Sequence, residues 1–169
     1  MMTRFFGLCV LASMLAACAS NPLEVTISRC PAVAIVGDTG TLTRFSGEGR
    51  TDEDVLFTAS ISDVAVSCDE GDAVSSAIGF YISAQSEGRL VNDSITLPYF
   101  VAVLKDNSEI ITKRVFDVTL RFDGNGYAVS REVLNQYIPS IDQARRYNYE
   151  LLIGFQLDVN DVAFNMERS

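Results

Sequence analysis

The sequence predicts an all-β fold, a sandwich of two antiparallel sheets. From Pro31 onward, apolar residues recur at every second position in most stretches, which is the period of a strand with one buried face. Turn sequences rich in Gly, Asp and Asn separate these stretches. Few segments carry the longer period of an amphipathic helix. Together these observations favour a sandwich of about seven strands over a helical or alternating α/β fold.

The first two expected strands are short. They cover residues 32–36 and 42–45, and each is followed by a turn sequence, Gly37-Asp38-Thr39-Gly40 and Ser46-Gly47-Glu48-Gly49. Their length predicts places near the edges of the sheets.

The third expected strand, residues 55–68, changes phase once. The shift falls at Ser62-Asp63 and predicts a β-bulge, because one extra residue returns the later apolar side chains to the same face. The two apolar sets are Val55, Phe57, Ala59 and Ile61, then Val64, Val66 and Cys68.

Residues 74–83 are expected to form the fourth strand. Residues 95–105 and 109–122 then predict a hairpin, because the tight connection Asp106-Asn107-Ser108 separates two strongly patterned stretches.

The C-terminal part of the chain mixes both element types. Residues 131–136, with Ser130 as N-cap, predict one or two helical turns before Pro139. Residues 149–159 predict the last strand, and residues 160–165 a short closing helix. The segment from Ile138-Pro139 to Tyr149 resembles the tyrosine corner of immunoglobulin-like and fibronectin-like domains, which implies a likeness of architecture only.

Near the N-terminus, an apolar run is followed by Leu15-Ala16-Ala17-Cys18. Arg4 precedes this run, residues 5–14, which at about ten residues is too short to span a bilayer. The segment resembles the signal peptide and lipobox of bacterial lipoproteins. The resemblance implies cleavage before Cys18 and acyl chains such as palmitate on the mature N-terminus. The alternative is an ordinary cleavage site of small residues, which would leave a soluble periplasmic protein.

These boundaries divide the chain into a signal peptide of residues 1–17, a tether of residues 18–29 and a β-sandwich domain of residues 30–169. By the same resemblance, Ala19 after the modified cysteine implies sorting to the periplasmic face of the outer membrane, with the inner membrane as the alternative.

Charge excludes two classes of partner. The mature chain keeps all 22 acidic residues and loses one of the 13 basic ones, so its formal charge moves from −9 to −10. Such a domain is repelled by nucleic acid and by anionic membrane surfaces, so the membrane anchor must come from the acyl chains.

Two cysteines remain for the folded domain, since Cys9 leaves with the signal peptide and Cys18 carries the lipid. Cys30 and Cys68 are expected to form a disulfide in an exported protein. A metal site is the alternative, but two thiols in a chain without histidine make a poor zinc ligand set. No metal and no cofactor are expected.

Asp38-Thr39-Gly40 resembles the catalytic turn of aspartic proteases, and Leu151 to Gly154 resemble the apolar pair and glycine that support that turn. The chemistry needs two carboxylates, and the chain has one copy, so a protease would have to be a homodimer. The alternative is a glycine-containing turn that ends a strand.

Acidic loops offer a second hypothesis. Residues 52–54 and 69–72 could hold a divalent cation if they met in space, whereas solvated loops are the alternative. Asp123-Gly124-Asn125-Gly126 begins like a calcium loop but lacks the later ligands, and so predicts a turn. With no histidine and no nucleophile motif, the protein is not expected to be an enzyme.

The strand at residues 99–104 is apolar on both faces. Tyr99, Val101 and Val103 lie on one face, and Phe100, Ala102 and Leu104 on the other. Only one face can enter the core, so the other needs a loop, a helix such as residues 131–136, or a partner protein. The sequence does not say which face is outward. If no part of the chain covers the outward face, Tyr99, Val101 and Val103 are the candidate interface, with Tyr99 as its anchor.

The whole chain resembles uncharacterised envelope lipoproteins of proteobacteria, a likeness that implies no activity. The leading hypothesis is therefore a membrane-anchored, non-enzymatic interaction or assembly component with an envelope protein as partner. A ligand- or cation-binding module and the dimeric aspartic protease are the alternatives. The matching landmarks are Cys30-Pro31 and residues 42–45, 98–103 and 154–157.

Overall fold

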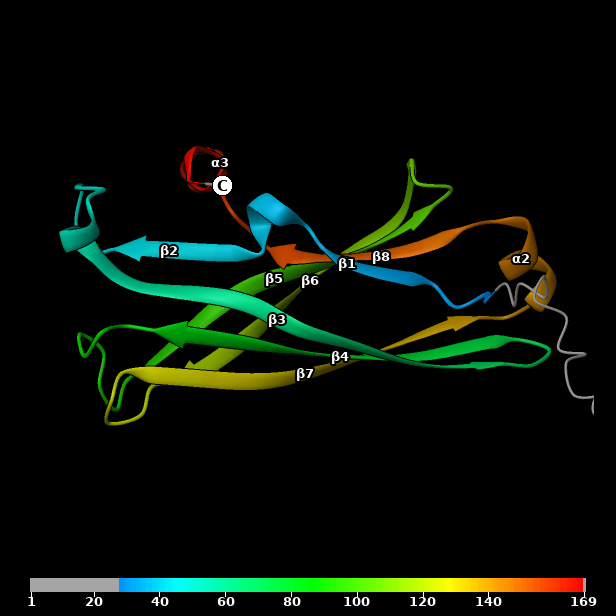
Figure 1. The fold of residues 1–169 in the computed structure, drawn as a ribbon, viewed down its shortest axis with the longest axis horizontal. Coiled ribbons are helices and arrows are strands. Elements are labelled where there is room, and N and C mark those ends of the chain that lie inside the picture. The colour runs from blue at the N-terminus through cyan, green and yellow to red at the C-terminus, as the bar shows by residue number, and fades with distance from the viewer. Residues whose placement is uncertain (1–27, 169) are drawn as a thin grey trace, which may run out of the picture.

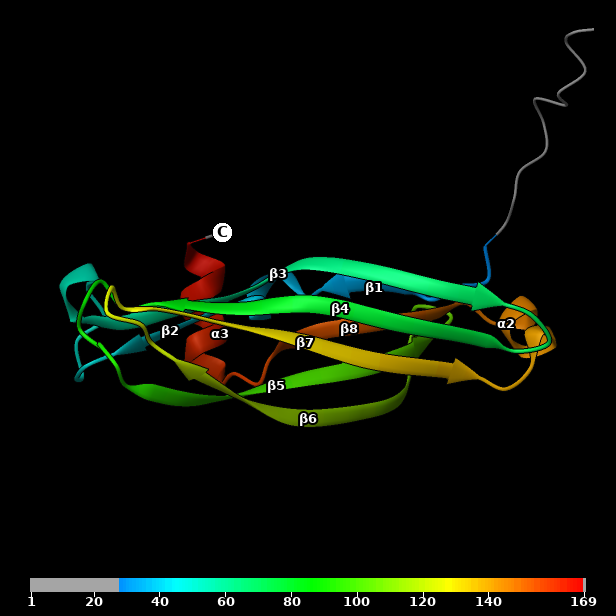
Figure 2. The ribbon, with the colours of Figure 1, turned by 90° about the horizontal axis from the view of Figure 1, so that it is seen from below.

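The computed structural model describes residues 28–168. Two sheets of four strands run along the same long axis, and their inner faces enclose the core (Figures 1 and 2). Sheet A has the order β1 (Ala32–Ile35), β8 (Tyr149–Phe155), β5 (Ser94–Lys105) and β6 (Glu109–Arg121). Sheet B has the order β2 (Thr41–Phe45), β3 (Val55–Glu70), β4 (Val74–Gln85) and β7 (Tyr127–Ile138). The predicted sandwich is confirmed, with eight strands in place of about seven.

Within residues 28–168, four short helices connect or flank the strands. Two are 3₁₀ turns, η1 (Gly37–Thr39) and η2 (Asp52–Asp54), and two are α-helices, α2 (Ile141–Arg146) and α3 (Val159–Glu167). α2 lies at the end where the described chain begins, and α3 lies toward the opposite end, beside β2 (Figure 1). No helix in residues 28–168 is long and apolar enough to cross a membrane.

The eighth strand is β7, where the sequence predicted a helix at residues 131–136. That prediction was wrong because β7 places polar Ser130, Glu132 and Gln136 on its inner face, which hides the strand period. The helical turn comes later, in α2, where the Ser140 hydroxyl accepts a hydrogen bond from the backbone N–H of Asp142 at 3.2 Å.

The predicted bulge and hairpin are both confirmed. In β3 the register shifts between Ser62 and Ala65, and Asp63 adopts a positive φ of 54°. In the β5–β6 turn, Asp106 and Asn107 have φ values of 53° and 57°, as a tight hairpin turn requires. The backbone N–H of Asn148 donates to Asp106 at 2.9 Å and fixes the hairpin tip to the start of β8.

The short strands β1 and β2 occupy sheet edges, as predicted. β1 pairs in parallel with β8, the last strand of the chain. Asn165 of α3 donates hydrogen bonds of 2.8 Å to the carbonyl oxygens of Asp38 and Thr41, and so covers part of the free edge of β2. The strand order differs from that of immunoglobulin domains, since β2 pairs with β3, so the likeness is one of two-sheet architecture.

The core lies between the inner faces of the two sheets. Tyr99 is its main polar member: its ring packs edge-on against Phe80 and stacks on Phe116, and its hydroxyl donates to Glu132 at 3.2 Å. Burial and the negative charge of Glu132 raise the pKa of Tyr99, so its hydroxyl stays protonated. The largest fully buried apolar side chains are Leu42, Val74, Ile78, Phe80, Ile82, Leu120, Ile153 and Phe155.

The expected disulfide is present between Cys30 and Cys68, with an S–S distance of 2.08 Å and a Cα–Cα distance of 6.1 Å. Cys30 precedes β1 of sheet A, whereas Cys68 lies in β3 of sheet B. The bond therefore joins the two sheets at the end where the described chain begins. The predicted lipidation of Cys18 and the predicted signal peptide concern residues outside those that the structure describes.

Candidate functional site

The structure decides which face of strand 99–104 is inward. Tyr99, Val101 and Val103 face the core and are only 2%, 9% and 8% exposed. The prediction that these three residues form an exposed interface anchored by Tyr99 was wrong, because the Tyr99 ring is held between two core aromatics.

The opposite face of β5 carries an apolar patch on the outside of sheet A. The main contacts of α2 are with β7, and those of α3 are with η1 and β2. Both helices lie toward the ends of the sandwich (Figure 2). Lys113 places its ammonium 4.4 Å from the centre of the Phe100 ring, and Gly154 leaves room for that ring because a Cβ there would come within 2.9 Å of it. This sheet A patch consists of Phe100, Ala102, Leu104, Ile110, Val115 and Leu152.

A cleft of about 310 Å³ opens between the two sheets beside β6 and β7. These two strands are edge strands on the same side of the sandwich and lie next to each other. The cleft has an apolar floor, which includes two of the three residues proposed from the sequence as an interface. Its apolar lining residues are Val101, Val103, Phe116, Leu134 and Leu151.

Polar side chains stand at the mouth of this inter-sheet cleft. Thr112 and Arg114 occupy inward positions of β6, opposite Val103 and Val101, yet both are exposed. Gln136 occupies an inward position of β7 and is half-buried. The sheets stay apart here because closing them would bury an arginine.

Sequence reasoning missed these cleft residues, although a signal was present. The inward apolar positions of β6, namely Leu120, Val118 and Phe116, give way to Arg114 and Thr112 without a change of register. A change from apolar to polar side chains on an inner face indicates that the core ends there.

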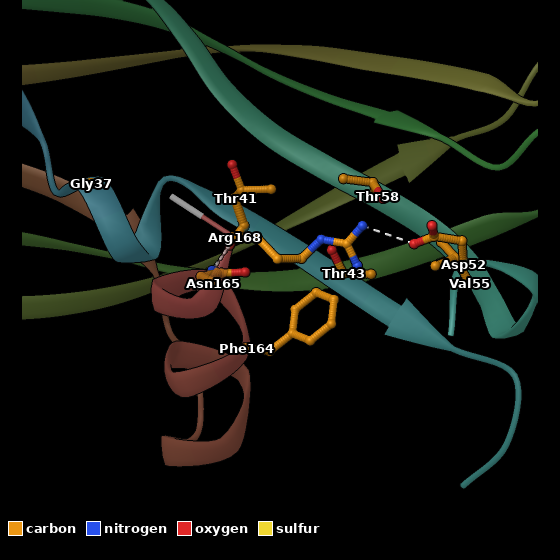
Figure 3. A pocket seen from close by; sticks show the side chains of 9 residues that line it. All are labelled: Gly37, Thr41, Thr43, Asp52, Val55, Thr58, Phe164, Asn165 and Arg168. Carbon is orange, nitrogen blue, oxygen red and sulfur yellow. Dashed lines mark hydrogen bonds and ion pairs between the residues drawn. The ribbon is translucent and has the colours of Figure 1, made fainter. Parts of the chain in front are cut away.

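A second hollow, of about 340 Å³, lies between β2, η2 and α3 (Figure 3). Threonines line one side of this pocket, and the Phe164 ring points into it. An ion pair of 2.8 Å between Arg168 and Asp52 spans the pocket, so its two charged groups already neutralise each other. The arrangement fastens α3 to sheet B and leaves no unpaired charge for a ligand.

The two acidic loops do not form one cation site. They lie at opposite ends of β3, whose 16 residues extend over about 50 Å, at about 3.3 Å per residue. In the first loop Asp54 accepts hydrogen bonds from Thr51, which lower the pKa of its carboxyl. In the second loop Glu70 accepts from the Arg29 N–H at 2.9 Å and the Ser28 hydroxyl at 2.8 Å, which lower its pKa as well.

Glu70 also belongs to a cluster with Cys30 and Cys68, whose potential ligand atoms lie within 4.8 Å of one another. The two sulfur atoms are bonded to each other, so the cluster is a disulfide with a neighbouring carboxylate. The loop at Asp123 is the predicted turn, since the Asp123 carboxylate accepts from the N–H groups of Asn125 and Tyr127.

The two protease-like segments do lie together. The Val36 N–H donates to the Ile153 carbonyl at 2.9 Å, and a Cβ at Gly154 would clash with the Thr39 hydroxyl oxygen. This packing explains Thr39 and Gly154 by the close approach of the η1 turn to β8, and a dimer would still have to supply a second carboxylate.

No family model, curated protein or solved structure matches this chain.

Proposed function

We propose that the protein is a lipid-anchored component of a bacterial envelope, held on the periplasmic face of the outer membrane through Cys18. In this proposal its β-sandwich acts without catalysis, as an interaction or assembly module for another envelope protein.

The disulfide is the observation that supports an exported protein. Structural disulfides form and persist in oxidising compartments such as the bacterial periplasm. Cys30 and Cys68 have the geometry of an ordinary bond, and both sulfurs are used within the domain. The pairing leaves Cys18 as the cysteine available for lipid, in agreement with the resemblance of residues 15–18 to a lipobox.

The sheet A patch is the docking face in this proposal. Val115 is 52% exposed and Ile110 62% exposed, beside the half-buried Phe100 and Leu104. Lys113 adds a cation within the patch. A fitting partner presents apolar side chains with an acidic group placed to meet Lys113.

The patch and the point where the chain enters the domain lie at the same end of sheet A. Strand registers place Ala32, Glu150, Leu104 and Ile110 in one row across the sheet. At about 4.8 Å per strand, Ile110 is about 14 Å from Ala32. The tether of residues 18–29 spans at most about 43 Å, so the proposed partner also lies at or near the membrane.

Labelling with radioactive palmitate tests the anchor. The wild-type protein should take up label and fractionate with outer-membrane markers on a sucrose gradient. Cys18→Ser should take up none and should accumulate as the unprocessed precursor. Label on the Cys18→Ser protein, or fractionation with inner-membrane markers, would contradict the corresponding part of the proposal.

Photocrosslinking in intact cells tests the docking face, and the chain offers a matched control. Val129 is 51% exposed on the outer face of sheet B, nearly the same as Val115 on sheet A. A photoreactive residue at position 115 should give a discrete crosslinked band that position 129 does not give. Lys113→Glu should weaken that band. Equal crosslinking from both positions would show that the sheet A patch is not the interface.

A further inference from the structure

The inter-sheet cleft has the features of a small-molecule site. Such sites are concave, are lined mostly by apolar side chains, and carry a few polar groups that set ligand orientation. The cleft combines an apolar floor, formed by Val101, Val103 and Leu151, with Arg114 and Gln136 at its mouth. Its volume of about 310 Å³ is at the lower end of the range for such sites, which suits one chain of medium length.

Arg114 is the group that selects the ligand charge. Within residues 28–168 its guanidinium takes part in no ion pair and no hydrogen bond. The carboxylate on the inner face of β7, Glu132, is already engaged, since it accepts from Tyr99 at 3.2 Å and from Ser130 at 2.8 Å. The guanidinium at the mouth is therefore free to bind a carboxylate or phosphate group with two parallel hydrogen bonds.

The apolar floor supplies the other half of the recognition. Val101 and Val103 are largely buried, whereas Phe116 and Leu134 are only half-buried although both face inward. A hydrocarbon chain inserted between the sheets would cover the exposed parts of these side chains.

From this geometry we propose that the inter-sheet cleft binds a single-chain amphiphile with an anionic head group. The hydrocarbon chain lies on the valine and leucine floor, and the head group meets Arg114 and Gln136 at the mouth. This site is separate from the sheet A patch, and the inference does not depend on lipidation of Cys18.

Decanoate is the probe, titrated into the soluble chain that begins at Ala19. This chain contains both sheets, the disulfide and every core residue. A cooperative thermal transition first establishes that it is folded. Decanoate should bind saturably, with amide chemical-shift changes at the cleft residues of β5, β6, β7 and β8. Decyltrimethylammonium has the same chain length and the opposite charge, and should bind at least tenfold more weakly.

Two charge-removing variants on the same strand separate the site from general electrostatics. Arg114→Gln should raise the Kd for decanoate at least tenfold, because it removes a charge-assisted pair of hydrogen bonds. Arg121→Gln is the control, since Arg121 lies on the outward, exposed side of β6, and should change the Kd less than twofold.

Leu134→Trp should fill the floor of the cleft and abolish binding. If Leu134→Trp fails to fold, Arg114→Gln still tests the site. The proposal is overturned if the two arginine variants weaken binding equally, if the cationic probe binds as tightly as decanoate, or if the shift changes map to the sheet A patch.

Discussion

Removal of the Cys30–Cys68 disulfide should destabilise the domain strongly while leaving its fold intact. The two cysteines are separated by 38 positions. In the chain-entropy model, closing a loop of that length lowers the entropy of the unfolded chain by about 13 cal/mol/K, or about 4 kcal/mol at 25 °C. The double variant Cys30→Ala/Cys68→Ala should lose most of this free energy of unfolding.

The loss can be restated as a shift in melting temperature. At about 2.1 cal/mol/K per residue, a domain of about 140 residues unfolds with an entropy of about 0.3 kcal/mol/K. A loss of about 4 kcal/mol then lowers the Tm by about 13 °C. The strands of both sheets stay hydrogen-bonded to one another without the disulfide. The far-UV circular dichroism of the variant should therefore match that of the wild type at low temperature.

Urea denaturation and thermal melting, each with and without reductant, measure the effect. Reduced wild-type protein should unfold at nearly the same urea concentration as the double variant, since the same constraint is missing from both. A loss below about 1 kcal/mol would refute the reasoning, because the loop constraint alone predicts about four times as much. Free thiols in the denatured, unreduced wild-type protein would refute the bond itself.

Three further predictions follow from neighbouring features. Val101→Glu should cost on the order of 3 kcal/mol or more, because it buries a charge in the core, whereas Val115→Glu, at an outward position of β6 that is 52% exposed, should shift the urea midpoint far less; equal losses would show that the faces of sheet A are misassigned. Because the pKa values of Glu70 and Asp123 are lowered in the folded protein, the folded state binds fewer protons than the unfolded state in acid. The free energy of unfolding should therefore be constant from pH 7 to about 5.5 and fall as the pH drops from about 5 through the lowered pKa values. The chain has no histidine, so a loss of stability already between pH 7 and 6 would contradict this prediction. Asp38→Asn should leave any peptidase activity of the purified protein unchanged, and a loss of activity in that variant would revive the dimeric protease hypothesis.

Period-two patterning predicted most of sheets A and B because the inner face of β5 is apolar from Ile95 to Val103 and that of β4 is interrupted only by Ser76. The same rule failed at β7, where Ser130, Glu132 and Gln136 face inward at the open side of the sandwich. Sequence could not show which face of β5 is inward, since Phe100 is as apolar as Tyr99. That choice depends on which sheet face meets Phe80, a contact between strands that no local pattern contains.

The inter-sheet cleft is likewise formed by residues that are far apart in the sequence. Arg114 and Leu134 approach each other only because β6 and β7 end up as adjacent edges of different sheets. Spacing along the chain does not encode that meeting, although the polar inward positions of β6 do signal that the core stops there.

The parallel pairing of β1 with β8 sets an order of events during folding. Ile35 pairs with Ile153, so the first strand of the chain waits for the last one before it can complete sheet A. The hairpins of sheet B and the β5–β6 hairpin join neighbouring segments and can form earlier. Cys30 and Cys68 both lie in the first half of the chain, so they can meet before β8 is in place. Formation of the disulfide can thus hold β1 beside sheet B before β8 is in place. β8 then pairs with β1 in the position already fixed by the disulfide, and this pairing completes the domain last.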